Sequence, residues 1–106
     1  MSERIAFKSG SLSLEGFIDR IPGKNGVVIT HPHPLYGGDM DNPVVETIRH
    51  VYRKAGYTTL RFNFRGVGNS EGSHDQGVGE ITDVKCAVDT LLEAGITNVH
   101  LAGYSF

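Results

Sequence analysis

The stretch YTTLRFNFRGVGNSEG, residues 57–72, is the most informative segment for the fold of this 106-residue chain. Its first part, Tyr57 to Asn63, is rich in β-forming residues and carries apolar side chains at alternate positions, which predicts a strand. Its second part, Arg65 to Gly72, has glycines at positions 66, 68 and 72, and glycine suits special backbone angles or close approach to a ligand. A strand that runs into such a loop is typical of a ligand site at the carboxyl end of a sheet.

The segments before this stretch predict more strands and a helix. Ser9-Gly10-Ser11 separates two short alternating apolar runs, which indicates a β-hairpin. Gly26 to Thr30 is a continuous apolar run of the kind found in strands buried on both faces. Asn42 then has the chemistry of a helix N-cap, Pro43 suits the first helical position, and Gly56 suits the end of that helix.

The segments after the stretch predict a second helix and a last strand. Apolar residues recur there at helical spacing up to a stop near Gly95, namely at Ile81, Val84, Val88, Leu91 and Leu92. Val99 to Tyr104 then predicts the final strand. The order hairpin, strand, helix, strand, helix, strand predicts an α/β fold, in which helices flank a mostly parallel sheet that begins with a β-hairpin. We expect residues 1–106 to form a single domain.

Composition narrows the classes of function. The formal net charge is −2 with both signs mixed along the chain, so we expect no nucleic-acid partner. The apolar runs are too short for a membrane span, and the N-terminal residues lack a signal-peptide core, so we expect no membrane association. Cys86 is the single cysteine, and it is interpreted as a half-buried filler rather than a nucleophile. Together these features favour the cytoplasm.

Three segments are expected at the carboxyl ends of the strands: residues 31–38, 63–72 and 103–106. Gly103-Tyr104-Ser105-Phe106 supplies the first four positions of the pattern G-x-S-x-G, in which a serine sits on a sharp turn between a strand and a helix. Taken alone, the pattern fits an ordinary surface serine equally well.

Two other kinds of site compete with a serine nucleophile. A dinucleotide-binding loop needs G-x-G-x-x-G in the first βα turn, whereas Glu71 stands where the third glycine belongs. His31 and His33 suggest a metal site, but only two histidines adjoin and metal sites need three or four ligands. We therefore expect neither a cofactor nor a metal. The proline-bracketed segment better suits a backbone N–H that stabilises an oxyanion.

The three segments together resemble the α/β-hydrolase superfamily, in particular its small cap-less, dienelactone-hydrolase-like esterase relatives. Residues 33–37 (HPLYG) resemble the family's His-Gly-x-x-Gly loop, with Pro34 in place of glycine. Residues 63–70 (NFRGVGNS) resemble its Asp-x-Arg-Gly-x-Gly-x-Ser loop, with Asn63 in place of the acid. Gly103-Tyr104-Ser105 matches the nucleophile elbow, so the resemblance covers the N-terminal half of such a fold.

The resemblance implies a role for each matching residue. Ser105 would be the acylated nucleophile in the hydrolysis of a carboxylic ester or related acyl bond. The backbone N–H groups of Phe106 and Leu35 would form the oxyanion hole, with Tyr36 as the next choice after Leu35. Arg65 and Ser70 would hold their loop beside the elbow. The implied partner is a small-molecule acyl substrate.

The resemblance also implies what this chain lacks. In the family the acid and the histidine follow the serine, and no residue follows Phe106 here. We therefore expect a fold truncated after its fifth strand, with strand order 1-2-4-3-5, that is inactive alone and could self-associate through its exposed sheet edge. A non-catalytic fragment or pseudo-hydrolase and a nucleotide-binding α/β module remain the alternatives.

Overall fold

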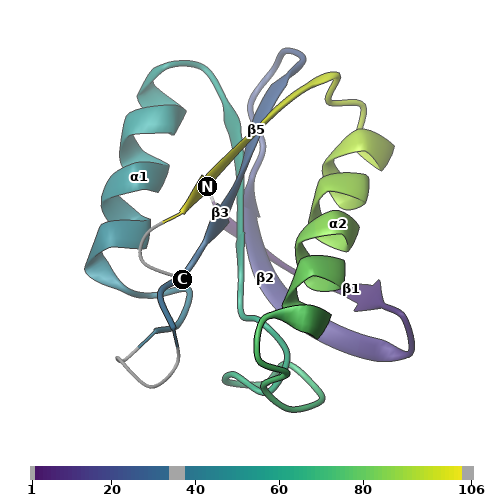
Figure 1. Cartoon of the computed structure of the whole chain (residues 1–106). Coiled ribbons are helices and arrows are strands. Elements are labelled where there is room, and N and C mark those ends of the chain that lie inside the picture. The colour runs from purple at the N-terminus through teal and green to yellow at the C-terminus, as the bar shows by residue number, and fades with distance from the viewer. Residues whose placement is uncertain (1, 34–37, 104–106) are drawn as a thin grey trace.

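The computed structural model describes residues 2–33 and 38–103, which contain five strands and two helices in the predicted order (Figure 1). These are β1 (Ser2–Ser9), β2 (Leu12–Asp19), β3 (Asn25–Thr30), α1 (Pro43–Lys54), β4 (Thr58–Phe62), α2 (Val78–Glu93) and β5 (Asn98–Gly103). None of the helices in the described part of the chain has the length and apolar character needed to cross a membrane.

The strands form one sheet in the order β1-β2-β4-β3-β5, as expected. β2 pairs antiparallel with both β1 and β4, whereas β3 pairs parallel with both β4 and β5. The two helices cover opposite faces of the sheet, and the loops that follow β3 and β4 gather at its lower edge in the view of Figure 1. This is the architecture of an α/β hydrolase fold up to its fifth strand.

Local signals in the sequence explain where the elements begin and end. Ser9 pairs with Leu12, so that Gly10 and Ser11 form the turn, and Gly10 has a φ of +61° that favours glycine. The side chain of Asn42 accepts a hydrogen bond from the backbone N–H of Val44 at 2.9 Å, which caps α1 as predicted. Both helices end just before a glycine with positive φ, as expected from Gly56 and Gly95.

The two faces of the sheet are held in different ways. Under α2 lies the larger apolar cluster, which contains Phe7, Leu14, Ile18, Val28, Leu60, Phe62, Phe64, Ala87, Leu91 and Ile96. Under α1 the apolar cluster has only three buried members: Val27, Ile29 and Val45. Partly buried apolar side chains pack against this cluster, and charged side chains share the face with them, where Arg49 from α1 pairs with the buried Asp19 of β2.

The buried stripe of α2 differs from the apolar pattern of its sequence. Ile81 and Leu92 are 72% and 49% exposed, although their spacing suggested the buried face. The buried positions are Gly79, Glu80, Asp83, Ala87 and Leu91. The stripe includes two carboxylates because the side chains of Glu80 and Asp83 bind the loop that precedes the helix, and hydrophobicity cannot reveal such positions.

Candidate active site

His31 links the end of β3 to the end of β4. Its Nε2 accepts a hydrogen bond from the backbone N–H of Phe64 at 3.1 Å, so its Nδ1 is the protonated nitrogen and donates to the Pro32 carbonyl at 2.7 Å. The side chain is fully buried, and burial lowers its pKa despite the opposing bond to Pro32. His31 is therefore a neutral structural residue, with no ring nitrogen left to bind a metal or accept a proton.

The segment after β3 is closed at its base. The backbone N–H of Gly38 donates to the carbonyl of His33 at 3.2 Å. A Cβ at position 38 would lie 1.7 Å from the Pro32 carbonyl oxygen, so the backbones approach too closely for any other residue. Leu35 and Tyr36, the predicted oxyanion donors of this segment, lie outside the described residues.

The nucleophile and its neighbour also lie outside the described residues, because the description ends at Gly103, two residues before Ser105 and three before Phe106. Gly103 is paired in register with Thr30, so β5 ends level with β3. A Cβ at Gly103 would lie 2.1 Å from the hydroxyl oxygen of Thr30. A side chain at position 103 would therefore displace the Thr30 hydroxyl from its present position.

Asn63 and Ser70 tie the loop after β4 to β2. The Asn63 amide donates to Glu15 Oε2 at 2.8 Å, and the backbone N–H of Asn69 donates to the same oxygen at 2.6 Å. The Ser70 hydroxyl donates to the carbonyl of Asn63 at 2.6 Å and accepts from the backbone N–H of Glu15 at 3.0 Å. These contacts hold Ser70 in the structural role that the family resemblance implied.

Two side chains, one in β4 and one just after it, hold Met40 in the segment after β3. Asn63 Oδ1 accepts from the backbone N–H of Met40 at 2.8 Å, and Arg61 donates to the Met40 carbonyl at 3.4 Å and to Asp41 at 3.1 Å. Arg61 and Asn63 are two residues apart, so they project from the same face of the strand. The Met40 side chain is itself buried, which leaves little freedom for this part of the chain.

Arg65 anchors the same loop to α2 through a buried ion pair. Its guanidinium contacts Asp83 at 2.8 Å, its backbone N–H donates to Asp83 at 3.0 Å, and the Ser9 hydroxyl donates to Asp83 at 2.6 Å. Burial alone would raise the pKa of Asp83, but the hydrogen bonds from Arg65 and Ser9 outweigh it and hold the pKa below its usual value. Arg65 is thus structural, as the resemblance implied.

Glu80 organises the last part of this loop. The buried carboxylate accepts from the backbone N–H groups of Asp75 and Gly77 at 2.9 and 3.1 Å, and His74 Nδ1 lies 3.0 Å from it. The His74 ring packs edge-on against His33, with ring centroids 4.6 Å apart. The loop after β3 therefore contacts the loop after β4 both near its beginning, at Phe64, and near its end, at His74. Among the residues that the structure describes, no three side chains are grouped to hold a metal ion.

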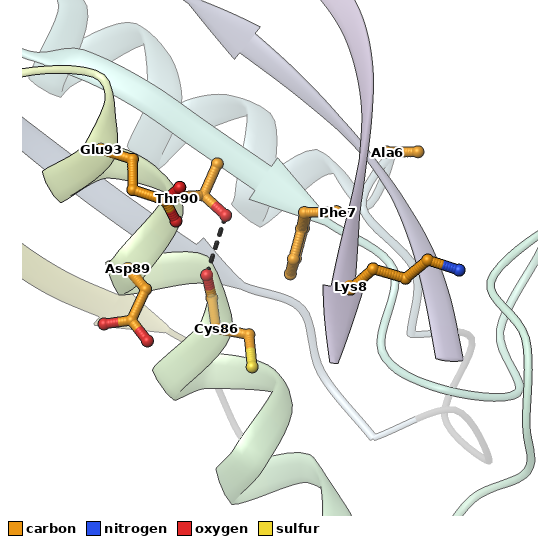
Figure 2. A pocket seen from close by; sticks show the side chains of 7 residues that line it. All are labelled: Ala6, Phe7, Lys8, Cys86, Asp89, Thr90 and Glu93. Atoms are coloured by element: carbon orange, nitrogen blue, oxygen red, sulfur yellow. Dashed lines mark hydrogen bonds between the residues drawn. The ribbon is translucent and has the colours of Figure 1, made fainter. Parts of the chain in front are cut away.

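Two hollows differ in their relation to these loops. One of about 630 Å³ is lined by residues of the network just described, including Glu15, Met40 and Asn63. The other, of about 440 Å³, lies between β1 and α2 and includes Cys86 (Figure 2). Cys86 is half-buried there, as expected from the sequence, and its backbone carbonyl accepts from the Thr90 hydroxyl at 2.8 Å.

Sequence reasoning missed the partners of the motif residues. The motifs identified Asn63, Arg65 and Ser70, but they did not identify Glu15 or Asp83, to which those residues are bonded. Alternation in β2 was the available signal, because Leu14 and Ile18 face the apolar cluster and leave Glu15 on the other face of a central strand. A carboxylate in that position needs a partner.

Comparisons with known proteins agree with this geometry. No family model matches the chain. An uncharacterized protein of Rickettsia prowazekii is 42% identical over 90 residues, which are 83% of this chain. An α/β serine hydrolase homologue from Coxiella burnetii is 39% identical, with a TM-score of 0.91 over 97% of this chain. A Xanthomonas campestris protein described as an α/β serine hydrolase without a lid is 32% identical, with a TM-score of 0.87 over 98%.

The matched proteins are much longer than this chain. The chain covers 38% of the Rickettsia protein, 51% of the Coxiella structure and 50% of the Xanthomonas structure. It therefore spans about half the length of the solved relatives, and the matched half is the one that contains the hairpin and the first crossovers.

Proposed function

We propose that this chain, which belongs to the α/β-hydrolase superfamily and matches its N-terminal half, carries the nucleophile of a serine hydrolase. The substrate would be a carboxylic ester or a related acyl bond, cleaved through an acyl-serine intermediate. The observation that carries the proposal is the common edge of β3, β4 and β5. Gly103, the first residue of the G-x-S pattern, is in register with Thr30, so β5 ends at the same edge of the sheet as β3 and β4. The likeness to two structures described as serine hydrolases supports it.

In the proposed reaction the Ser105 hydroxyl attacks the acyl carbon, and the leaving group departs as an alcohol or its equivalent. The N–H groups of Phe106 and Leu35 would stabilise the negative charge on the acyl oxygen. Water would then release the acid and restore the serine. None of these steps requires a metal or a cofactor.

The serine needs a base within hydrogen-bond reach. His31 does not serve, because both of its ring nitrogens are engaged in hydrogen bonds to the backbone and its side chain is fully buried. We place the base and the acid of the triad outside these 106 residues, so the isolated chain would be inactive. We further propose a cytoplasmic protein that binds a small acyl substrate and neither nucleic acid nor membrane.

We also propose that the isolated chain self-associates at β5. Within the described residues β5 pairs only with β3, and Leu101 on it is 59% exposed. An unpaired edge with apolar side chains is prone to pairing with another chain.

Labelling with a fluorophosphonate probe tests the catalytic proposal. We expect the longer protein that carries this chain to be labelled at Ser105, and the 106-residue chain to react at least about 10³-fold more slowly because it lacks the base. Ser105→Ala should abolish the label, whereas the control Ser73→Ala, at an exposed serine of the loop after β4, should not change it. Undiminished labelling of Ser105→Ala would refute the proposed nucleophile, and rapid labelling of the short chain would refute the missing base.

A further inference from the structure

We infer that Glu15 is a positioning residue that sets the orientation of the Asn63 amide and, through it, the backbone at Met40. Its consequence for catalysis rests on the proposed function, because Met40 follows the segment that contains the proposed oxyanion donor Leu35. The three residues come from β2, from the end of β4 and from the loop after β3. No motif in the sequence points to Glu15.

The pairing of β2 with β4 places Glu15 beside Asn63. The ladder runs from Asp19 paired with Thr59 to Gly16 paired with Phe62. The backbone N–H of Asn63 donates to the carbonyl of Glu15 at 3.0 Å, which extends the ladder by one residue pair. The two side chains are therefore cross-strand neighbours on the sheet face that α1 covers.

The carboxylate fixes which way the Asn63 amide points. Its NH₂ group donates to Glu15 Oε2 at 2.8 Å, so its oxygen faces the backbone N–H of Met40, also at 2.8 Å. A flipped amide would set its oxygen against the carboxylate and its NH₂ group against another N–H. Glu15 is held in turn, because the N–H of Asn69 donates to Oε2 at 2.6 Å and Arg4 donates to Oε1 at 3.3 Å.

The oriented amide makes the shorter of the two side-chain hydrogen bonds that hold the Met40 backbone. Met40 lies two residues after Gly38, which closes the segment after β3 by its bond to His33. On the carbonyl side Met40 is held by Arg61 at 3.4 Å, a longer contact than the 2.8 Å bond from Asn63. Loss of the amide's orientation should therefore loosen the segment at its second end.

The departure from the family pattern fits this role. The resembling motif has an aspartate where this chain has Asn63, and an aspartate cannot donate to Glu15. With Glu15 in place, Asn63→Asp would set two carboxylates against each other. If position 15 were glutamine, its NH₂ group could donate to an aspartate at position 63, whose other oxygen would still accept from Met40.

This reciprocity gives a rescue experiment in the longer protein that carries this chain. Asn63→Asp, Glu15→Gln and the double variant are compared with the wild type by hydrogen exchange at the Met40 amide and by the rate of fluorophosphonate labelling. We expect Asn63→Asp to lower Met40 protection and the labelling rate by about tenfold, and added Glu15→Gln to recover most of both losses. The Asn69 amide should lose protection in both variants that carry Glu15→Gln, because the glutamine NH₂ group would then face it.

Controls and contrary outcomes separate the two proposals. Arg4→Gln removes an exposed partner of Glu15 and should leave Met40 unchanged. A double variant no better than Asn63→Asp at Met40, or recovery of exchange without recovery of labelling, would overturn the positioning role. A wild-type protein that is never labelled would refute the proposed function. Hydrogen exchange at the Met40 amide would still show whether Glu15 positions the Met40 backbone. If Asn63→Asp does not fold, Asn63→Ala is used in its place. Met40 protection that is lost in Asn63→Ala and is not restored by added Glu15→Gln would support the positioning role. Restored protection would refute it.

Discussion

The two faces of the sheet are built from the same strands but differ in the side chains that they bury. Beneath α2 the side chains of β3 and β4 join a large apolar cluster, and one buried ion pair, Arg65 with Asp83, closes its end. Beneath α1 the buried apolar cluster is small, and buried charged and amide groups such as Asp19, Arg61 and Asn63 share that face with it. The first face supplies most of the apolar burial, whereas the second directs polar side chains toward the loops at the carboxyl edge.

This division suggests that substitutions under α2 should act on stability, whereas those under α1 should act on the placement of the loops. Three measurements test whether the two faces differ in this way.

The largest effect is expected from Leu60→Ala, a fully buried residue of β4 within the cluster under α2. The lost burial and the cavity should reduce the free energy of unfolding by about 3–5 kcal/mol. Val45→Ala, in the small cluster under α1, removes fewer atoms and should cost roughly half as much. Urea unfolding followed by circular dichroism measures both, and equal losses would argue against the difference between the faces.

A somewhat smaller effect is expected from Asp83→Asn, which leaves Arg65 without its buried counter-charge. We expect a loss of about 3 kcal/mol at pH 7. Because the pKa of Asp83 is lowered in the folded state, its contribution is present above the unfolded pKa and is lost as pH falls below about 4.

The variant should therefore lose part of the acid sensitivity of the wild type, as urea midpoints at pH 7 and pH 3 would reveal. Asp19→Asn under α1 is the matched control. Its partner Arg49 also pairs with Glu46 and so keeps a counter-charge, and a smaller loss of about 1 kcal/mol is expected. A larger loss in the control would contradict the assignment of stability to the α2 face.

The smallest effect concerns His31, at the boundary between the faces. Burial lowers its pKa, so the unfolded chain binds a proton at higher pH than the folded chain does. Its contribution to stability is thus complete above the unfolded pKa near 6.5 and declines as pH falls below it. His31→Gln, which keeps an acceptor near Phe64, should reduce the fall in unfolding free energy between pH 7 and pH 5 by up to about 1 kcal/mol; an unchanged pH slope would count against a neutral His31.

Much of the fold could be predicted because its signals are local. The turn at Gly10, the cap at Asn42 and the helix ends before Gly56 and Gly95 depend on neighbouring residues, and all four were confirmed. The strand order was inferred from the family resemblance and was also confirmed. The prediction of the buried stripe of α2 was partly wrong, because the stripe includes two carboxylates. Glu80 binds backbone N–H groups just before the helix, and Asp83 binds Ser9 and Arg65, which are distant in the sequence.

The candidate site could be predicted less completely for the same reason. Motif residues such as Asn63 and Ser70 carry a recognisable spacing, whereas Glu15 is recognised only when the register of β2 and β4 is known. Ser105, Phe106 and Leu35 stay predictions, since they lie outside the described residues. Sequence spacing indicates which residues share a loop, but it does not indicate which strands meet across the sheet.

The close approach of Thr30 to Gly103 has a consequence for how homologous sequences should vary. The threonine hydroxyl occupies the space that a side chain at position 103 would need, so the two positions should be inherited as a pair. Homologues that keep a threonine or larger residue at position 30 should retain glycine at 103, and alanine should appear at 103 only where residue 30 has become alanine or glycine. The glycine at position 103 would then be conserved because of residue 30 in the adjacent strand, and not only because of the turn that follows it.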